Sequence, residues 1–373
     1  MKVEKRPIRV AQMMTEMNYG GVEMVVMNYY RHIDHSKVQF DFFVLEGSEI
    51  PQRKEIEELG GRIYIVPHYK HLIQYEKTLI KLFKENNYKI VHSHMNALSV
   101  FSLRAAKKAG IPVRIAHNHS TAGKGEYKKN IVKYMLRPLA KIYPTNLAAC
   151  SECAGRWLFG KKANFTVFNN GVEIDKFKYN EQIRNNMREK LNIEDKFVIG
   201  NVGRLCYQKN QKILLYVLKE LNKMENKYAL ILLGDGEDKN KLEVLAKKLE
   251  IENDIIFMGN VTDTSSYYNI MDIFAFPSRY EGLGIACVEA QINGLKCLVS
   301  EFVPDNAYVG EVKRCQLDNI TQWITEICNL DSKRVRFVEE YFNKKGFNIK
   351  IESQKLLYYY LKLLNNDRNN KND

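Results

Sequence analysis

Residues 276–290 read Phe-Pro-Ser-Arg-Tyr-Glu-Gly-Leu-Gly-Ile-Ala-Cys-Val-Glu-Ala and carry the strongest structural signal in the chain. The apolar run 273–276 is typical of a buried strand, and 284–293 of a helix, with a loop containing Gly282 and Gly284 between them. A strand followed by a glycine-rich loop and a helix is typical of a parallel α/β sheet, in which ligands bind at the carboxyl ends of the strands. Free N–H groups at such a helix start attract anions, and glycine lets a phosphate approach the backbone closely.

Two carboxylates flank this expected anion site. Glu281 stands just before it, and Glu289 lies about a turn and a half into the helix. Carboxylates accept hydrogen bonds from hydroxyl groups, so the pair can bind one ligand at two points. A ligand with a diphosphate between two polyols satisfies all three features, and a nucleotide sugar is such a ligand.

A second loop of the same kind occupies residues 203–210, Gly-Arg-Leu-Cys-Tyr-Gln-Lys-Asn, again between a strand and a helix. Arg204 and Lys209 are expected at the carboxyl end of that strand, where two cations neutralise a diphosphate leaving group. Taken singly, each is an ordinary exposed residue at a helix start; together with the first motif they favour a binding site. The chain contains no Asp-x-Asp pair, so we expect no metal or other cofactor at the diphosphate.

Strand and helix signals alternate along both halves of the chain, which predicts two doubly wound parallel α/β sheets. The length of 373 residues fits two domains. A polar stretch near 170–190 interrupts the alternation, so the expected domains are 1–175 and 176–349. A Leu/Tyr-rich helix follows at about 350–364. The ligand is expected in a cleft at the carboxyl ends of the strands.

The net charge of +13 is concentrated in the first half, where residues 1–175 contain 27 Lys and Arg against 16 Asp and Glu. Lys129, Lys133, Arg137 and Lys141 recur every four residues, so a helix would align them on one face. With the apolar residues between them, the segment 129–141 is expected to lie on an anionic membrane surface. The alternative is a helix with an apolar core face and solvated lysines. No zinc-finger spacing or RNP motif is present, so no nucleic-acid partner is expected.

Two further features of the chain bear on its location in the cell. No apolar run approaches the length of a transmembrane helix, and the N-terminal apolar run is too short for a signal peptide. The seven cysteines are odd in number and scattered along the chain, which favours a reduced protein. We therefore expect a cytoplasmic protein that is peripheral at the inner face of the cell membrane.

With these motifs the chain resembles the retaining glycosyltransferases of family GT4. The resemblance covers nearly the whole chain and is carried by three features: Pro-Ser-x-x-Glu-Gly-x-Gly with Glu281-x7-Glu289, Gly-Arg-Leu with a following Lys, and Gly20-Gly21-Val22-Glu23 after the first strand. It implies the GT-B fold, two Rossmann-like domains facing a central cleft. The subgroup it resembles makes bacterial capsular or exopolysaccharides.

The resemblance also implies a role for individual residues. Arg204 and Lys209 would bind the donor diphosphate, and the amides of Leu283 and Gly284, beside Gly282, its distal phosphate. Glu289 would hold the ribose, and Glu281 would contact the sugar. Gly21 would let a loop of the acceptor domain approach the diphosphate, and the C-terminal helix would pack back on the first domain.

Two His-x-His pairs follow strands, at His92 and His94 and at His117 and His119. The resemblance favours His117 as a hydrogen-bond partner of the transferred sugar. The alternative is that these are loop histidines satisfied by the backbone. A metal site is not expected because no third ligand pattern is apparent.

The reaction implied is transfer of a sugar, with retention, from a nucleotide diphosphate sugar to a lipid-diphosphate-linked saccharide, with UDP as the favoured nucleotide. The expected chemistry is front-side attack, with the departing phosphate taking the acceptor's proton. Two alternatives remain open: a nucleotide-sugar epimerase of the same fold, and a non-catalytic scaffold that binds nucleotide sugars. A glycoside hydrolase needs two carboxylates that flank the bond it cleaves, and the sequence shows no evident pair of this kind.

Overall fold

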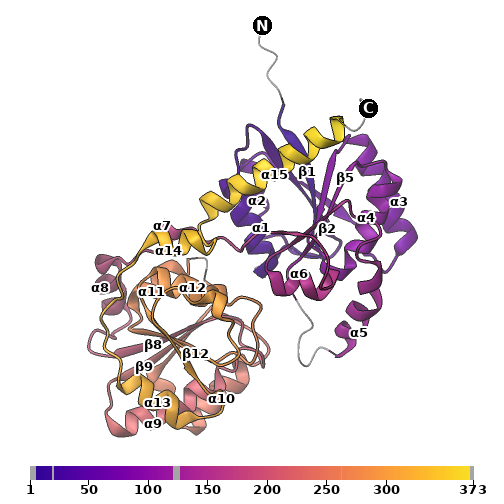
Figure 1. The fold of residues 1–373 in the computed structure, drawn as a ribbon. Coiled ribbons are helices and arrows are strands. Elements are labelled where there is room, and N and C mark those ends of the chain that lie inside the picture. The colour runs from indigo at the N-terminus through magenta and orange to yellow at the C-terminus, as the bar shows by residue number, and fades with distance from the viewer. Residues whose placement is uncertain (1–5, 19–20, 121–126, 262, 370–373) are drawn as a thin grey trace. The chain divides into compact units, whose positions relative to one another are not determined.

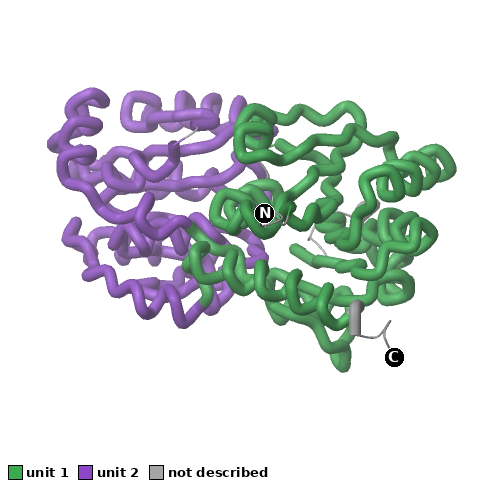
Figure 2. Tube along the Cα trace, turned by 90° about the horizontal axis from the view of Figure 1, so that it is seen from above, with its two compact units in different colours: residues 1–172, 346–373 green, residues 173–345 purple. Residues whose placement is uncertain are grey.

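A computed structural model describes residues 6–18, 21–120, 127–261 and 263–369. The chain forms two compact units, one of Met1–Val172 with Gly346–Asp373 and one of Glu173–Lys345 (Figures 1 and 2). The expected ranges 1–175 and 176–349 differ from these bounds by three or four residues. Each unit is built around its own parallel sheet, so the predicted α/β class with two doubly wound sheets is confirmed.

The first unit contains a seven-stranded sheet in the order β3-β2-β1-β4-β5-β6-β7, with every pairing parallel. Its strands are β1 (Ile8–Met13), β2 (Val38–Leu45), β3 (Arg62–Val66), β4 (Ile90–Ser93), β5 (Val113–Asn118), β6 (Asn146–Ala149) and β7 (Thr166–Val167). The strand order reverses between β1 and β4, and ligands of such sheets bind at this point, outside the carboxyl ends of the strands.

Helices cover both faces of this sheet, so its strands are apolar on both sides. On one face α1 (Gly21–His32) and α15 (Ile349–Asn369) pack on Val10, Phe40 and Phe42. On the other, α3 (Leu72–Glu85) and α4 (Ser99–Lys108) pack on Met13 and Phe43. The unit also contains α2 (Arg53–Glu58), α5 (Tyr127–Leu136) and α6 (Glu152–Phe159).

The C-terminal helix α15, yellow in Figure 1, belongs to the first unit. Tyr360 on this helix is fully buried, and its ring meets that of Phe40 edge-on at a centroid distance of 6.2 Å. Residues from the end of the chain therefore complete a core otherwise built from residues 1–172.

The second unit contains a six-stranded sheet in the order β10-β9-β8-β11-β12-β13. Its strands are β8 (Phe197–Val202), β9 (Tyr228–Leu233), β10 (Ile255–Gly259), β11 (Ile273–Phe276), β12 (Lys296–Ser300) and β13 (Val312–Cys315). Its helices are α7 (Ile174–Phe177), α8 (Glu181–Lys190), α9 (Lys212–Met224), α10 (Lys239–Lys248), α11 (Ser265–Ile270), α12 (Ile285–Ile292), α13 (Ile320–Cys328) and α14 (Glu339–Lys344). The order reverses between β8 and β11, and the two loops singled out in the sequence follow these strands.

The basic segment 129–141 departs from the expectation of one continuous helix. Helix α5 ends at Leu136, and a 3₁₀ turn spans Arg137–Leu139. Pro138 explains the break, because proline has no N–H to continue the ladder and disfavours helical geometry at the residue before it. Arg137 and Lys141 therefore lie beyond the helix, so the prediction that all four cations share one helical face is wrong. The side chain of Lys129 lies outside the described residues.

Candidate active site

The loop between β11 and α12 has the geometry expected for close approach of an anion. Gly284 is the N-cap of α12 and has left-handed backbone angles, φ 82° and ψ 54°. A Cβ there would lie 3.1 Å from the Phe276 ring, so both conformation and space favour glycine. Among the described residues, no side chain caps this helix, which leaves its first N–H groups available to a ligand. A Cβ on Gly282 would meet nothing within 4 Å, so packing alone does not require that glycine.

Lys209 and Glu281, 72 residues apart, form an ion pair beside this loop. Lys209 Nζ lies 2.6 Å from Glu281 Oε1, and the side chains are 17% and 7% exposed. The ammonium also lies 4.6 Å from the centre of the Phe276 ring. The family resemblance implied that Lys209 binds the diphosphate and that Glu281 contacts the sugar; the structure shows the two side chains paired with each other.

One backbone–backbone and one side chain–backbone hydrogen bond join the two loops. The Arg279 N–H donates to the Gln208 carbonyl at 2.7 Å, and the Gln208 side chain donates to the Tyr280 carbonyl at 3.0 Å. The loop after β8 is thereby held against the loop after β11. Arg204, in the same loop as Gln208, is exposed, and its carbonyl accepts a hydrogen bond from Gln211.

Two glycines after β9 also shape this site, and they were not among the site residues expected from the sequence. A Cβ on Gly234 would lie 2.3 Å from the Gly203 carbonyl oxygen, and one on Gly236 would lie 2.4 Å from that of Leu205. The loop after β9 therefore packs backbone to backbone against the loop that carries Arg204. The Gly-x-Gly pattern after a strand was the available signal.

Glu289 lies on α12, and its Oε2 accepts a 2.7 Å hydrogen bond from the Tyr268 hydroxyl. Tyr268, on α11, is fully buried, and sequence reasoning missed it because nothing local marks a tyrosine as the partner of a carboxylate 21 residues away. Burial raises the pKa of Glu289 to about 7, and the Tyr268 hydrogen bond only partly opposes this. The carboxyl is thus placed to bind ligand hydroxyls in a partly dehydrated position.

Glu289→Gln is expected to change how stability depends on pH. Because the folded pKa lies above the unfolded value of 4.5, the folded protein binds more protons between about pH 4.5 and 7, and its stability falls as pH rises through that window. The variant lacks this loss. Its free energy of unfolding, relative to that of wild type, should therefore rise by up to about 3 kcal/mol between pH 5 and pH 8. Urea unfolding at both pH values measures it. The exposed Glu252→Gln serves as control, and an equal difference at both pH values would contradict the shift.

His117 and Gly21 belong to the first unit, whereas the residues above belong to the second. Gly21 begins α1, and a Cβ there would meet nothing within 4 Å; Gly20 lies outside the described residues. His117 ends up 3% exposed and hydrogen-bonded to His92 at 3.0 Å. Among the described residues, both ring nitrogens of His92 and His94 and the Nδ1 of His117 bond to other side chains, so the alternative that the backbone satisfies these rings is wrong.

The histidines also correct the argument made against a metal. Strands β4 and β5 are neighbours, so His92, His94 and His117 place one ring nitrogen each within 4.8 Å of one another. A three-ligand set therefore exists that the sequence did not reveal. Both nitrogens of His92 and His94 and the Nδ1 of His117 already bond to side chains, whereas His117 Nε2 has no partner among the described residues.

Comparisons with known proteins identify the family of this chain. The profile of "Glycosyltransferase Family 4" matches residues 19–176, and that of "Glycosyl transferases group 1" matches residues 183–313. A Bacillus subtilis protein described as "Putative glycosyltransferase EpsF" is 32% identical, covering 94% of this chain and 96% of that protein. The Escherichia coli UDP-Gal:alpha-D-GlcNAc-diphosphoundecaprenol alpha-1,3-galactosyltransferase is 26% identical, covering 98% and 100%.

Solved structures share the fold. HepE from Anabaena, solved in complex with UDP and glucose, has a TM-score of 0.74 at 17% identity and covers 98% of both chains. The sucrose-phosphate synthase of Thermosynechococcus elongatus has a TM-score of 0.76 at 14% identity, covering 96% of this chain and 99% of that one. Because the family profiles cover both sheet units and a 32% identical relative is matched over 96% of its length, the chain belongs to glycosyltransferase family 4 and has the GT-B fold.

Proposed function

We propose that this glycosyltransferase moves a sugar, with retention, from a UDP-sugar to a lipid-diphosphate-linked saccharide during synthesis of a capsular or exopolysaccharide. The observation that carries the proposal is the Lys209–Glu281 pair beside the uncapped, glycine-led start of α12. The E. coli relative, whose name specifies a UDP-sugar and a diphosphoundecaprenol-linked acceptor, supports the choice of donor and acceptor.

Each group has a defined task in this proposal. The N–H groups of Leu283 and Gly284 bind the distal phosphate, and Lys209 with Arg204 stabilises the negative charge that develops on the leaving diphosphate. Glu289 binds the ribose hydroxyls. The acceptor oxygen forms the new bond to the anomeric carbon, the bond to the diphosphate oxygen breaks, and that phosphate takes the acceptor's proton. These residues act by position and charge, so the proposed chemistry needs no cofactor.

Nucleotide binding followed by a transfer assay tests this function. UDP at a hundredfold excess over its Kd should stabilise the protein by about 2.7 kcal/mol in thermal unfolding. We expect a smaller shift with GDP or ADP, and a smaller UDP shift in Glu289→Gln. A folded protein that responds to none of the three nucleotides would contradict the donor assignment.

The transfer assay separates the competing functions. A glycosyltransferase releases UDP from a UDP-sugar only as a lipid-linked acceptor gains a sugar. An epimerase converts the donor without an acceptor, and a scaffold binds UDP without turnover. Either of those results would overturn the proposal.

We also propose that the enzyme is cytoplasmic and lies at the inner face of the membrane through the segment after β5. Ile131 and Met135 on α5 are 59% and 71% exposed, and Ile142 beyond it is 53% exposed. Lys133, on the same helix, adds positive charge among these apolar side chains. Exposed apolar groups interspersed with cations suit an anionic bilayer surface. No described helix is long and apolar enough to cross a membrane.

Ile131→Ser/Met135→Ser is expected to weaken binding to phosphatidylglycerol-containing vesicles by about tenfold or more, because each change removes apolar surface from the bilayer interface. Vesicle co-sedimentation measures it. Ile73→Ser, at a 75% exposed position on α3 of the same unit, is the matched control and should bind as wild type does. Equal binding by all three proteins would argue against this surface.

A further inference from the structure

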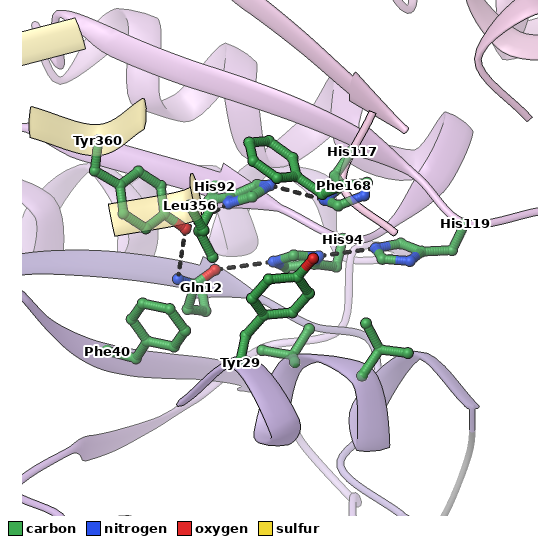
Figure 3. A pocket seen from close by; sticks show the side chains of 12 residues that line it. Gln12, Tyr29, Phe40, His92, His94, His117, His119, Phe168, Leu356 and Tyr360 are labelled. Atoms are coloured by element: carbon green, nitrogen blue, oxygen red, sulfur yellow. Dashed lines mark hydrogen bonds between the residues drawn. The ribbon is translucent and has the colours of Figure 1, made fainter. Parts of the chain in front are cut away.

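Six polar side chains in the first unit form one continuous hydrogen-bonded chain (Figure 3). Its members are Gln12 on β1, His92 and His94 at β4, His117 and His119 at β5, and Tyr360 on α15. They line a cavity of about 10 Å³, about the space of one water molecule. Gln12 and Tyr360 are fully buried.

The histidines of this chain are uncharged at neutral pH. Burial lowers the pKa of all four rings, to about 3 for His119, and the neighbouring imidazoles lower it further for the other three. A neutral imidazole has one N–H donor and one lone pair. Each bond in the chain therefore determines which nitrogen of the next ring carries the proton.

The amide of Gln12 sets the direction in one half of the chain. Its Nε2 donates to the Tyr360 hydroxyl at 3.2 Å, which leaves the hydroxyl's own hydrogen to donate to His92 Nδ1, 2.7 Å away. The proton of His92 is then on Nε2, which donates to His117 Nδ1 at 3.0 Å. The proton of His117 is therefore on Nε2.

In the other half of the hydrogen-bonded chain, the bonds have the same donor-to-acceptor direction. Gln12 Oε1 accepts from His94 Nε2 at 2.9 Å, so the lone pair of His94 is on Nδ1. That nitrogen accepts from His119 Nε2, also at 2.9 Å. One amide thus orients every bond between His119 and His117.

This hydrogen-bonded chain ends at an N–H group that has no acceptor among the described residues. His117 Nε2 is buried and has no hydrogen-bond partner within the described ranges, although its ring lines the cavity. A buried N–H without a partner is costly, so this atom is suited to an oxygen that arrives with a ligand.

We propose that Gln12 and Tyr360 are positioning residues that act through His92 to hold His117 as its neutral Nε2–H tautomer, so that it donates a hydrogen bond to a hydroxyl oxygen of the transferred sugar. The inference rests on the proposed sugar transfer. It also gives the C-terminal helix α15 a role in the site. The Tyr360 hydroxyl on this helix accepts a hydrogen bond from Gln12 and donates one to His92.

Nitrogen-15 NMR of the histidine rings tests the tautomers without any substrate. In wild type at pH 7, His92 and His117 should each show a proton on Nε2 and none on Nδ1. A proton on Nδ1 of His117, or a doubly protonated ring, would overturn the proposal. This measurement needs no variant to fold.

Tyr360→Phe tests the relay, because it removes one hydroxyl and keeps the ring. The Nε2–H state of His117 should no longer be the single form, and kcat/KM for the sugar donor should fall about tenfold. The Kd for UDP should stay at the wild-type value, because the proposed nucleotide-binding residues belong to the other unit. An unchanged His117 tautomer in this variant would refute the relay, and an equal loss of UDP affinity would indicate a structural defect instead.

Tyr29→Phe is the matched control. Tyr29 lines the same cavity, but its hydroxyl donates to the Asn169 carbonyl at 2.6 Å and takes no part in the chain. This variant should leave the tautomers and kcat/KM unchanged. If wild type transferred no sugar from any nucleotide sugar, the proposed function would fail, whereas the NMR result would still decide whether Gln12 and Tyr360 fix His117.

Discussion

Lys209→Met is expected to lower kcat for sugar transfer by about 10²–10³-fold, by analogy with the loss of one oxyanion-hole donor. Methionine keeps an apolar stem against the Phe276 ring but removes the ammonium, which lies 2.6 Å from Glu281 Oε1. Charge on the departing diphosphate then lacks one of its two proposed cations. Steady-state kinetics with a UDP-sugar and a lipid-linked acceptor measure the effect.

Lys209 pairs with Glu281, so a control must distinguish two effects of the substitution: loss of the cation that acts on the ligand, and loss of the partner of Glu281. Lys209→Met alone leaves a carboxylate only 7% exposed without its partner. The double variant Lys209→Met/Glu281→Gln removes both charges, so its stability should recover toward wild type while its kcat stays low. Lys212→Met, at an exposed position at the start of α9, should retain wild-type kcat. Full activity in Lys209→Met would rule out the proposed role of the ammonium.

Asp272→Ala is expected to destabilise the second unit by about 3–5 kcal/mol, because it leaves buried cations without their counter-ion. Asp272 is 4% exposed and pairs with Arg184 and Arg188, and its Oδ2 accepts the Val198 N–H at 2.7 Å. The site ties α8 to the central strands β8 and β11. Urea denaturation monitored by circular dichroism measures the change.

Asp331→Ala tests whether burial, and not charge, sets the size of that loss. Asp331 pairs with Lys296, but its side chain is 56% exposed. Surface pairs contribute little, so the expected change is below about 1 kcal/mol. Similar losses in the two variants would contradict the argument from burial.

The strand–loop–helix of residues 273–292 was predictable from sequence because its determinants are local. An apolar run, a pair of glycines and a helical repeat lie within 20 residues, and backbone preference at Gly284 places the start of α12. The wrong prediction for residues 129–141 also has a local cause. The four-residue spacing of the cations indicated one helical face, but Pro138 lies within that segment and ends the helical geometry.

Local sequence patterns were sufficient to predict the two-sheet architecture and the loops that carry Arg204, Lys209, Glu281 and Glu289. Which side chains meet depends on the tertiary packing. Lys209 pairs with Glu281 because β8 and β11 are neighbours in the sheet, and Tyr360 reaches His92 across 268 residues because α15 packs on the first unit. Backbone preferences depend on adjacent residues, whereas side-chain contacts depend on strand order and helix packing, which bring together residues that no sequence spacing relates.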